Sequence, residues 1–135
     1  MRLRVEENAI QRRPAIRATR EQLPILFGAD PAAVRGADWG DLRSIVISLP
    51  AGTNLSPLLQ GLPNDLCPCP HWGYVIKGQM RVSYADTEEV LRAGDLFYLP
   101  AGHTGLVEED FEAVEFSRPL EHEPVMDVIK HNAGS

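Results

Sequence analysis

Two cysteines and a histidine alternate with prolines in the segment that runs from Cys67 to His71. Residues two apart in an extended chain project to the same side, so Cys67, Cys69 and His71 are expected to point together. Pro68 and Pro70 favour this extended form, because proline fixes its own φ and biases the preceding residue toward β geometry. Thiolates and imidazoles are metal ligands. The spacing therefore predicts part of a metal site.

The same two cysteines are poorly placed for a structural disulfide. In an extended chain the Cα atoms of Cys67 and Cys69 lie about 6.6–7 Å apart, at or beyond the usual limit for a disulfide. We therefore expect free thiols or thiolates in a reducing compartment.

Length and composition predict a single globular domain over residues 1–135. The hydrophobic share of 44% and the charged share of 24% are ordinary for such a domain. The net charge of -6 argues against nucleic acid as a partner, since phosphate binding usually needs a basic face. One basic segment stands apart and is expected to be solvated; its arginines are Arg2, Arg4, Arg12, Arg13, Arg17 and Arg20.

Neither a long apolar run nor a leader-like N-terminus occurs in the sequence, so we expect a cytoplasmic protein that does not interact with a membrane.

Short strands that alternate with turns dominate the second half of the chain. Glycine, proline and aspartate delimit predicted strands over 42–49, 73–77, 79–84, 88–91, 96–99 and 113–116. Such a series predicts an antiparallel sandwich or barrel. Weak strands are expected at Leu3, Val5 and at Ala15, Ile16, and a turn or short helix over 28–39. Residues 54–65 are expected to form a loop that could carry function. One or two helical turns are expected over 124–131, beginning at Pro124.

The glycine and proline pattern of residues 73–78 and 93–103 resembles the two motifs of the cupin superfamily, in particular small single-domain bacterial cupins. The resemblance implies an all-β antiparallel double-stranded β-helix, the cupin or jelly-roll barrel. It further implies an irregular N-terminal arm and turn region over 1–41, a barrel core over 42–117 and a tail over 118–135. It also implies a homodimer.

The resemblance carries over to the ligand positions only in part. Counting back from Gly78, the family's glutamate position falls on His71, and its two histidine positions fall on Cys67 and Asp65. The histidine position of the second motif falls on Gly105, while His103 lies one strand repeat earlier. The predicted metal ligands are therefore Cys67, Cys69, His71 and His103, with Asp65 as a substitute for Cys69 and Glu115 as a weaker candidate for the wall.

Ligand type favours one divalent metal, Zn²⁺, because thiolates and imidazoles suit zinc better than the carboxylate and histidine sets that suit iron or manganese. Four such ligands would close a structural site, and three plus water would leave an open one. Each residue also has a plainer interpretation. The cysteines could be small buried hydrophobic residues, His71 a hydrogen-bonded wall residue, and His103 a solvent-facing turn residue.

Several other side chains are expected to be unrelated to chemistry. His122 and His131 are predicted at the surface of the tail, and Arg43 could point either inward, toward an anionic ligand, or outward. Four aromatic residues are expected to pack or form dimer contacts, namely Trp72, Tyr74, Phe97 and Tyr98.

Three functional hypotheses follow from these features. The first is a small metal-binding barrel that binds or transforms a small molecule at its mouth. The second is a non-enzymatic sensor whose zinc-bound thiolates respond to oxidants. The third is a metal-free dimeric binding module. No catalytic or substrate-binding residue can be assigned from the sequence, and whether the protein is an enzyme stays open.

Overall fold

The computed structural model describes residues 15–134 of the chain. The predicted strand at Leu3 and Val5 lies outside these residues, as do Arg2, Arg4, Arg12 and Arg13. Ala15 and Ile16 do not form a strand. Arg17 is exposed as expected, but Arg20 is half-buried and pairs with Asp30 and Glu112, so this part of the basic segment is docked on the sheet.

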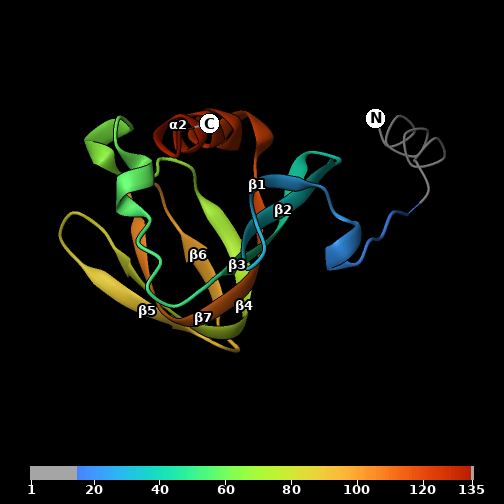
Figure 1. The fold of residues 1–135 in the computed structure, drawn as a ribbon, viewed down its shortest axis with the longest axis horizontal. Helices are drawn as coiled ribbons and strands as arrows, with labels where there is room; N and C mark the ends of the chain where they lie inside the picture. Colours follow the sequence, from blue (N-terminus) through green and yellow to red (C-terminus); the bar gives the residue numbers. More distant parts are fainter. Residues whose placement is uncertain (1–14, 135) are drawn as a thin grey trace, which may run out of the picture.

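The described chain folds as an antiparallel all-β structure with one α-helix beside it (Figure 1). Its strands are β1 (Ile25–Ala29), β2 (Ala32–Trp39), β3 (Leu42–Leu49), β4 (His71–Ser83), β5 (Glu88–Arg92), β6 (Leu96–Leu99) and β7 (Thr104–Ser117). They pair in the order β1-β2-β3-β7-β4-β5, and β6 pairs with the first half of β4. The predicted all-β cupin fold class is confirmed.

Residues 28–39 form no helix; they contain the end of β1 and all of β2, which corrects the prediction for this stretch. The sequence of β2 has only one β-branched residue, Val34, and a central Gly36, so its intrinsic preference for a strand is weak. Its backbone nevertheless pairs with β3 from Ala33 to Trp39. Tertiary pairing overrides the local preference here.

Strand β4 is continuous where the sequence predicted two strands separated by a turn at Gly78. Gly78 has a φ of +85°, and its pairing with β7 shifts register on both sides of this residue. A Cβ atom at this position would collide with the backbone carbonyl of Asp110. The strand therefore bends at Gly78, so that its first half faces β6 and its second half faces β5.

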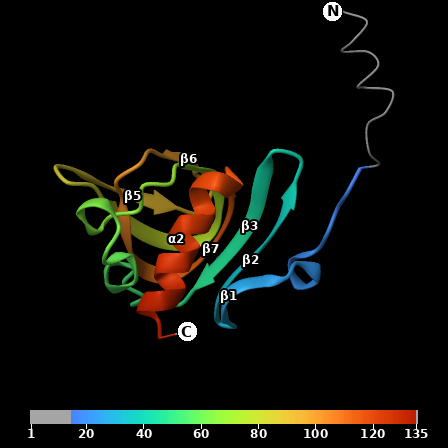
Figure 2. The same ribbon diagram turned by 90° about the horizontal axis from the view of Figure 1, so that it is seen from above.

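Helix α2 (Pro119–Asn132) lies across one end of the sheet structure (Figure 2). It begins at Pro119 rather than at Pro124, which lies inside the helix. The predicted loop over 54–65 contains two short 3-10 helices, Ser56–Leu59 and Pro63–Asp65, and a third one precedes the sheet at Arg20–Gln22. The Asn132 side chain ties the end of α2 to this loop by donating to the carbonyls of Leu58 and Gln60.

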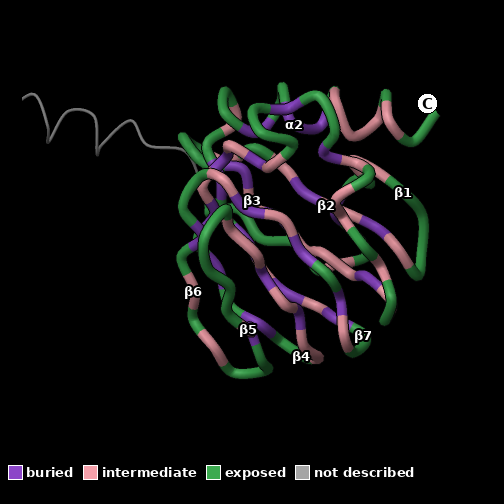
Figure 3. The backbone as a smooth tube through the Cα atoms, turned by 90° about the vertical axis from the view of Figure 1, so that its left-hand side faces the viewer, coloured by how far each residue is buried: buried purple, intermediate pink, exposed green. Residues whose placement is uncertain are grey.

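Two clusters of buried side chains hold these parts together, and buried positions alternate along the strands (Figure 3). The larger lies between the strands and includes Val75, Val82 and Phe111. The smaller joins the loop, the cysteine segment and α2 through Leu59, Leu62, Cys67, Cys69 and Val125. Within residues 15–134 no helix is both long and apolar enough to cross a bilayer.

Gly78→Ala is expected to lower the free energy of unfolding by about 2 kcal/mol or more, since it adds a collision to the cost of a left-handed backbone. Gly94→Ala is the matched control. Gly94 has a similar φ of +93°, but nothing lies within 4 Å of its Cβ position. Urea denaturation of both variants measures the difference, and equal losses would contradict a role for the contact with Asp110.

Candidate metal centre

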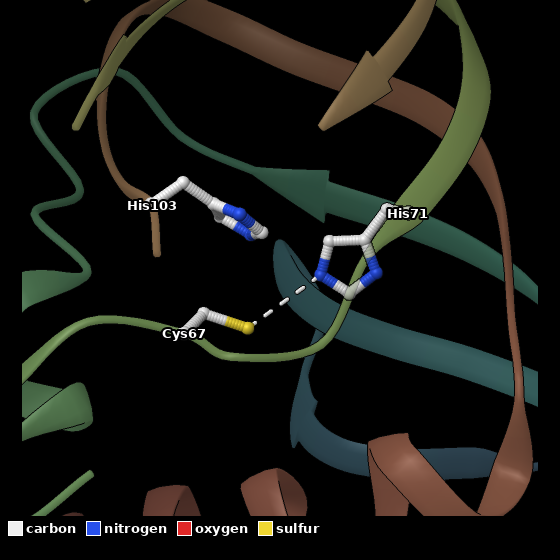
Figure 4. Close-up of side chains that lie close together, drawn as sticks. All are labelled: Cys67, His71 and His103. Carbon is white, nitrogen blue, oxygen red and sulfur yellow. Dashed lines mark hydrogen bonds between the residues drawn. The ribbon is translucent and has the colours of Figure 1, made fainter. Parts of the chain in front are cut away.

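Three of the four predicted ligands converge at one end of the barrel interior (Figure 4). One ligand atom from each of Cys67, His71 and His103 lies within 4.8 Å of the others. All three side chains are buried. They come from the segment before β4, the first residue of β4 and the segment before β7.

Backbone hydrogen bonds hold the two segments that carry Cys67 and His103 together. The Cys67 N–H donates to the His103 carbonyl at 2.8 Å, and the Gly102 N–H donates to the Cys67 carbonyl at 2.7 Å. This short antiparallel bridge sets the two side chains beside each other before any metal binds.

His103 presents a defined ring nitrogen to the centre. Its Nδ1 lies 2.8 Å from the Pro100 carbonyl, which can only accept a hydrogen bond, so Nδ1 carries the proton. In the neutral ring, Nε2 is then the nitrogen with the free lone pair. Burial, together with the neighbouring His71, lowers the pKa of His103 and favours this neutral, ligand-competent form.

His71 is arranged in a similar way. Its Nε2 lies 3.7 Å from the Cys67 Sγ, and its Nδ1 lies 2.6 Å from the Ser117 Oγ on β7. Ser117 accepts from Nδ1–H in the tautomer that leaves the Nε2 lone pair directed toward Cys67. Burial lowers the pKa of His71 to about 4, so the ring is neutral near pH 7.

Cys67 is a thiol in this arrangement, because burial raises its pKa to about 12. Its geometry also fits a thiolate ligand. Zinc bonds of about 2.3 Å to sulfur and 2.0 Å to nitrogen at a tetrahedral angle would separate the two ligand atoms by about 3.5 Å. The observed separation between Cys67 Sγ and His71 Nε2 is 3.7 Å.

The fourth predicted ligand, Cys69, is not brought to this group. The chain bends at Cys69, so the alternation expected from an extended segment does not hold there. The Cys69 thiol donates to the Pro70 carbonyl. Burial raises the pKa of Cys69 to about 11, and a hydrogen bond with Ser117 partly offsets this rise. Cys69 thus contacts the serine that orients His71. Asp65, the suggested substitute, is exposed and accepts from the Gly61 N–H instead.

Glu115 lines the wall of the site, in the position that the sequence suggested for it. Its carboxylate lies 3.7 Å from the Nδ1 of His71, and burial raises its pKa to about 7. His71 is therefore neutral near pH 7, where the Glu115 carboxyl group is about half protonated. Ser117, two residues further along β7, was not identified from the sequence. The one available signal was its period-two spacing from Ala113 and Glu115, which places it on the same inward face of the strand.

His122 is buried, which corrects its predicted place at the surface, whereas His131 is exposed as expected. His122 lies on the face of α2 that also buries Val125 and Met126, at helical spacing, and this face packs on the barrel. Arg43 is also buried and points inward. Its guanidinium contacts the His122 ring at 3.0 Å.

A cavity of about 180 Å³ adjoins these residues. Its polar end is formed by Cys67, His71, His103, Glu115 and His122. The rest of its wall is almost entirely apolar and comes from the strands, the 54–65 loop and α2.

The comparisons with known proteins agree with this antiparallel barrel fold. The sequence profile of the AraC-like ligand binding domain matches residues 70–115. The cupin fold that the resemblance implied is therefore confirmed. No functionally curated protein matches the sequence.

Solved structures support the same fold at low sequence identity. An RmlC-like cupin from Shewanella frigidimarina is 18% identical with a TM-score of 0.54, over 76% of this chain and 88% of that chain. KdgF from Halomonas sp. is 20% identical with a TM-score of 0.54, over 75% of this chain and 92% of that chain. An S161A mutant of oxalate decarboxylase OxdC from Bacillus subtilis is 20% identical with a TM-score of 0.54, over 73% of this chain and 28% of that chain.

Acid is expected to destabilise the metal-free protein between about pH 6.5 and 4.5. His71 and His122 have a pKa of about 4 in the folded chain and 6.5 in the unfolded chain, and burial lowers the pKa of His103 as well. The unfolded chain therefore takes up at least two more protons there. Glu115 acts in the opposite direction with one proton, because its pKa is raised from 4.5 to about 7. The net excess is at least one proton, which gives a loss of at least about 1.4 kcal/mol per pH unit.

Glu115→Gln removes the opposing proton and is expected to steepen this loss. Urea denaturation of both proteins across this pH range, in the presence of a chelator, measures the slopes. A flat profile in the unsubstituted protein, or a shallower one in Glu115→Gln, would contradict the assignment.

Proposed function

We propose that this protein binds one divalent metal, zinc, through Cys67, His71 and His103, and binds a small molecule in the adjoining cavity. The observation that carries the proposal is the convergence of three ligand atoms within 4.8 Å of one another. The far ring nitrogens of both histidines already have hydrogen-bond partners, as is typical of ligating histidines.

The donor set supports zinc among the divalent metals. One sulfur and two imidazole nitrogens form a soft to borderline set, and three protein ligands leave a coordination position for an exogenous group. When bound, zinc would act as a Lewis acid toward an oxygen of that group. Cys67, His71 and His103 would hold the ion, Ser117 would orient His71, and the apolar wall would exclude water. No residue is assigned a catalytic role.

Cys67→Ser and His103→Ala are each expected to lower the zinc content of the purified protein from about one per chain to background. Mass spectrometry of untagged protein measures the content, and circular dichroism checks the fold. Cys69→Ser is the matched control, because Cys69 is equally buried but lies outside the cluster. Equal loss in the control, or zinc retained in both ligand variants, would refute the proposed ligand set.

We further propose that the protein is a homodimer formed through an outward face of the sheet. This face, which we call the aromatic face, consists of Trp72, Tyr74, Ile76, Leu96, Tyr98 and Phe116. The pairing of β4 with β6 and β7 places these residues side by side on neighbouring strands. The six residues are all apolar or aromatic, and the one charged group recorded against them is the guanidinium of Arg118, 5.3 Å from the centroid of the Trp72 ring. A second copy of the same face would match it around a two-fold axis. The cytoplasmic location and the absence of a nucleic-acid partner stay predictions.

Leu96→Glu is expected to convert the dimer to a monomer, because two-fold symmetry would bury two carboxylates in one apolar interface. Leu96 is 83% exposed in the single chain, so the substitution leaves the fold of the monomer intact. Leu120→Glu is the control, since Leu120 is 91% exposed but lies on α2, outside the aromatic face. Light scattering after size exclusion gives the mass; a monomeric unsubstituted protein would overturn the proposal.

A further inference from the structure

The cavity beside the metal ligands has two chemically distinct parts. Its body is lined by apolar side chains from the strands and from α2, among them Phe27, Ile45, Leu49, Val82, Val125 and Met126. Its titratable side chains gather at one end. At about 180 Å³ it is slightly larger than an apolar cavity of about 150 Å³ that accommodates benzene. The space therefore suits a molecule of roughly six to ten non-hydrogen atoms.

His122 contributes a hydrogen-bond donor to the polar end. The Nη1 of Arg43 lies 3.0 Å from His122 Nδ1, and a guanidinium can only donate, so Nδ1 accepts. The neutral imidazole then carries its proton on Nε2. Burial lowers the pKa of His122 to about 4, so the ring is neutral near pH 7.

Arg43 is itself held in place by two carboxylates. Its Nε lies 2.7 Å from Asp38 Oδ1, and its Nη1 lies 2.8 Å from Glu123 Oε1. The guanidinium does not line the cavity, whereas the His122 ring does. Because the two ring nitrogens point in diverging directions, the Nε2–H is directed away from Arg43, on a side chain that lines the cavity.

Within residues 15–134 no backbone or side-chain oxygen accepts a hydrogen bond from His122 Nε2. The side chain is only 5% exposed. Among the described residues, His122 Nε2 is not one of the fully enclosed polar atoms without a partner, so it reaches open space, where a donor finds its partner in a bound molecule or in water. The arrangement therefore calls for an acceptor atom in the cavity, next to the metal ligands.

We infer that the cavity binds a short, mainly apolar molecule whose carbonyl or carboxylate oxygen accepts a hydrogen bond from His122 Nε2–H. His122 is thus a ligand-positioning residue, oriented by Arg43. This inference rests on the ligand-binding part of the proposed function and requires none of the metal ligands. A polyhydroxylated molecule of similar size is disfavoured, because most of its hydroxyl groups would lose their hydrogen bonds to water against the apolar wall.

Calorimetric titration of the purified protein with hexanamide tests the inference. We expect saturable binding by the unsubstituted protein, at least about tenfold weaker binding by His122→Phe, and near-normal binding by His122→Gln, whose amide nitrogen can supply the donor. Hexanoate in parallel shows whether a charged head group is preferred. Xylose, a polar molecule of comparable size, is expected not to bind.

A second measurement needs no variant. In ¹⁵N spectra of the histidine side chains, His122 is expected to be protonated on Nε2, and its Nε2 resonance is expected to shift on addition of hexanamide. Hexanamide binding that is equal in His122→Phe, an unshifted His122 resonance at saturation, or xylose binding in preference to hexanamide would overturn the inference.

Zinc content measured on the same samples separates this inference from the metal proposal. Protein without zinc that still binds hexanamide through His122 would refute the metal and support the inference. Protein that contains one zinc per chain but binds neither hexanamide nor hexanoate would support the metal proposal and refute this inference.

Discussion

The backbone bridge between Cys67 and His103 is the contact on which the candidate site depends. It joins the segment before β4 to the segment before β7, far apart in sequence, through hydrogen bonds of 2.7 and 2.8 Å. Without it, Cys67 would have no reason to lie near either histidine, because the preceding loop has little regular structure of its own. The bridge is in turn covered by α2, whose Val125 packs in the same buried cluster as Cys67. The 54–65 loop, the segments that precede β4 and β7, and helix α2 therefore meet at the candidate site.

The long pair β4 and β7 supplies the other half of the site. Bending at Gly78 lets a single strand pair with β6 at one end and β5 at the other, which curves the sheet around the core. The unbent first half carries His71 inward, and the facing half of β7 carries Glu115 and Ser117 inward beside it. The same alternation directs Trp72 and Phe116 outward, so the site and the aromatic face are two sides of one pair of strands.

The sequence predicted the parts of this structure that follow from local patterning, and missed those that depend on long-range packing. Turn residues located the later strands, because glycine, proline and aspartate mark strand ends directly. The sequence did not predict strand β2, because pairing with β3 rather than local composition makes this segment a strand. Cys69 shows the limit of spacing arguments: proline favours an extended segment, but the bend at this residue turns its thiol from the cluster toward Ser117. His122 was placed at the surface because a short polar tail shows no strong apolar stripe, and only the docked helix reveals its buried face.

The titratable side chains that line the cavity are buried and favour their uncharged forms, and they are not stabilised by ion pairs. His71, His122 and Cys67 all have pKa values shifted toward their uncharged forms, mainly by desolvation, and Glu115 is shifted in the same sense. The guanidinium of Arg43, which contacts the His122 ring, is compensated by the carboxylates of Asp38 and Glu123. A wall of uncharged polar groups offers hydrogen-bond donors and lone pairs in fixed directions. It does not create the electrostatic potential that a net charge would. Such a wall favours a ligand or metal whose own geometry matches those directions, since a buried group that fits poorly loses its hydrogen bonds to water without replacement.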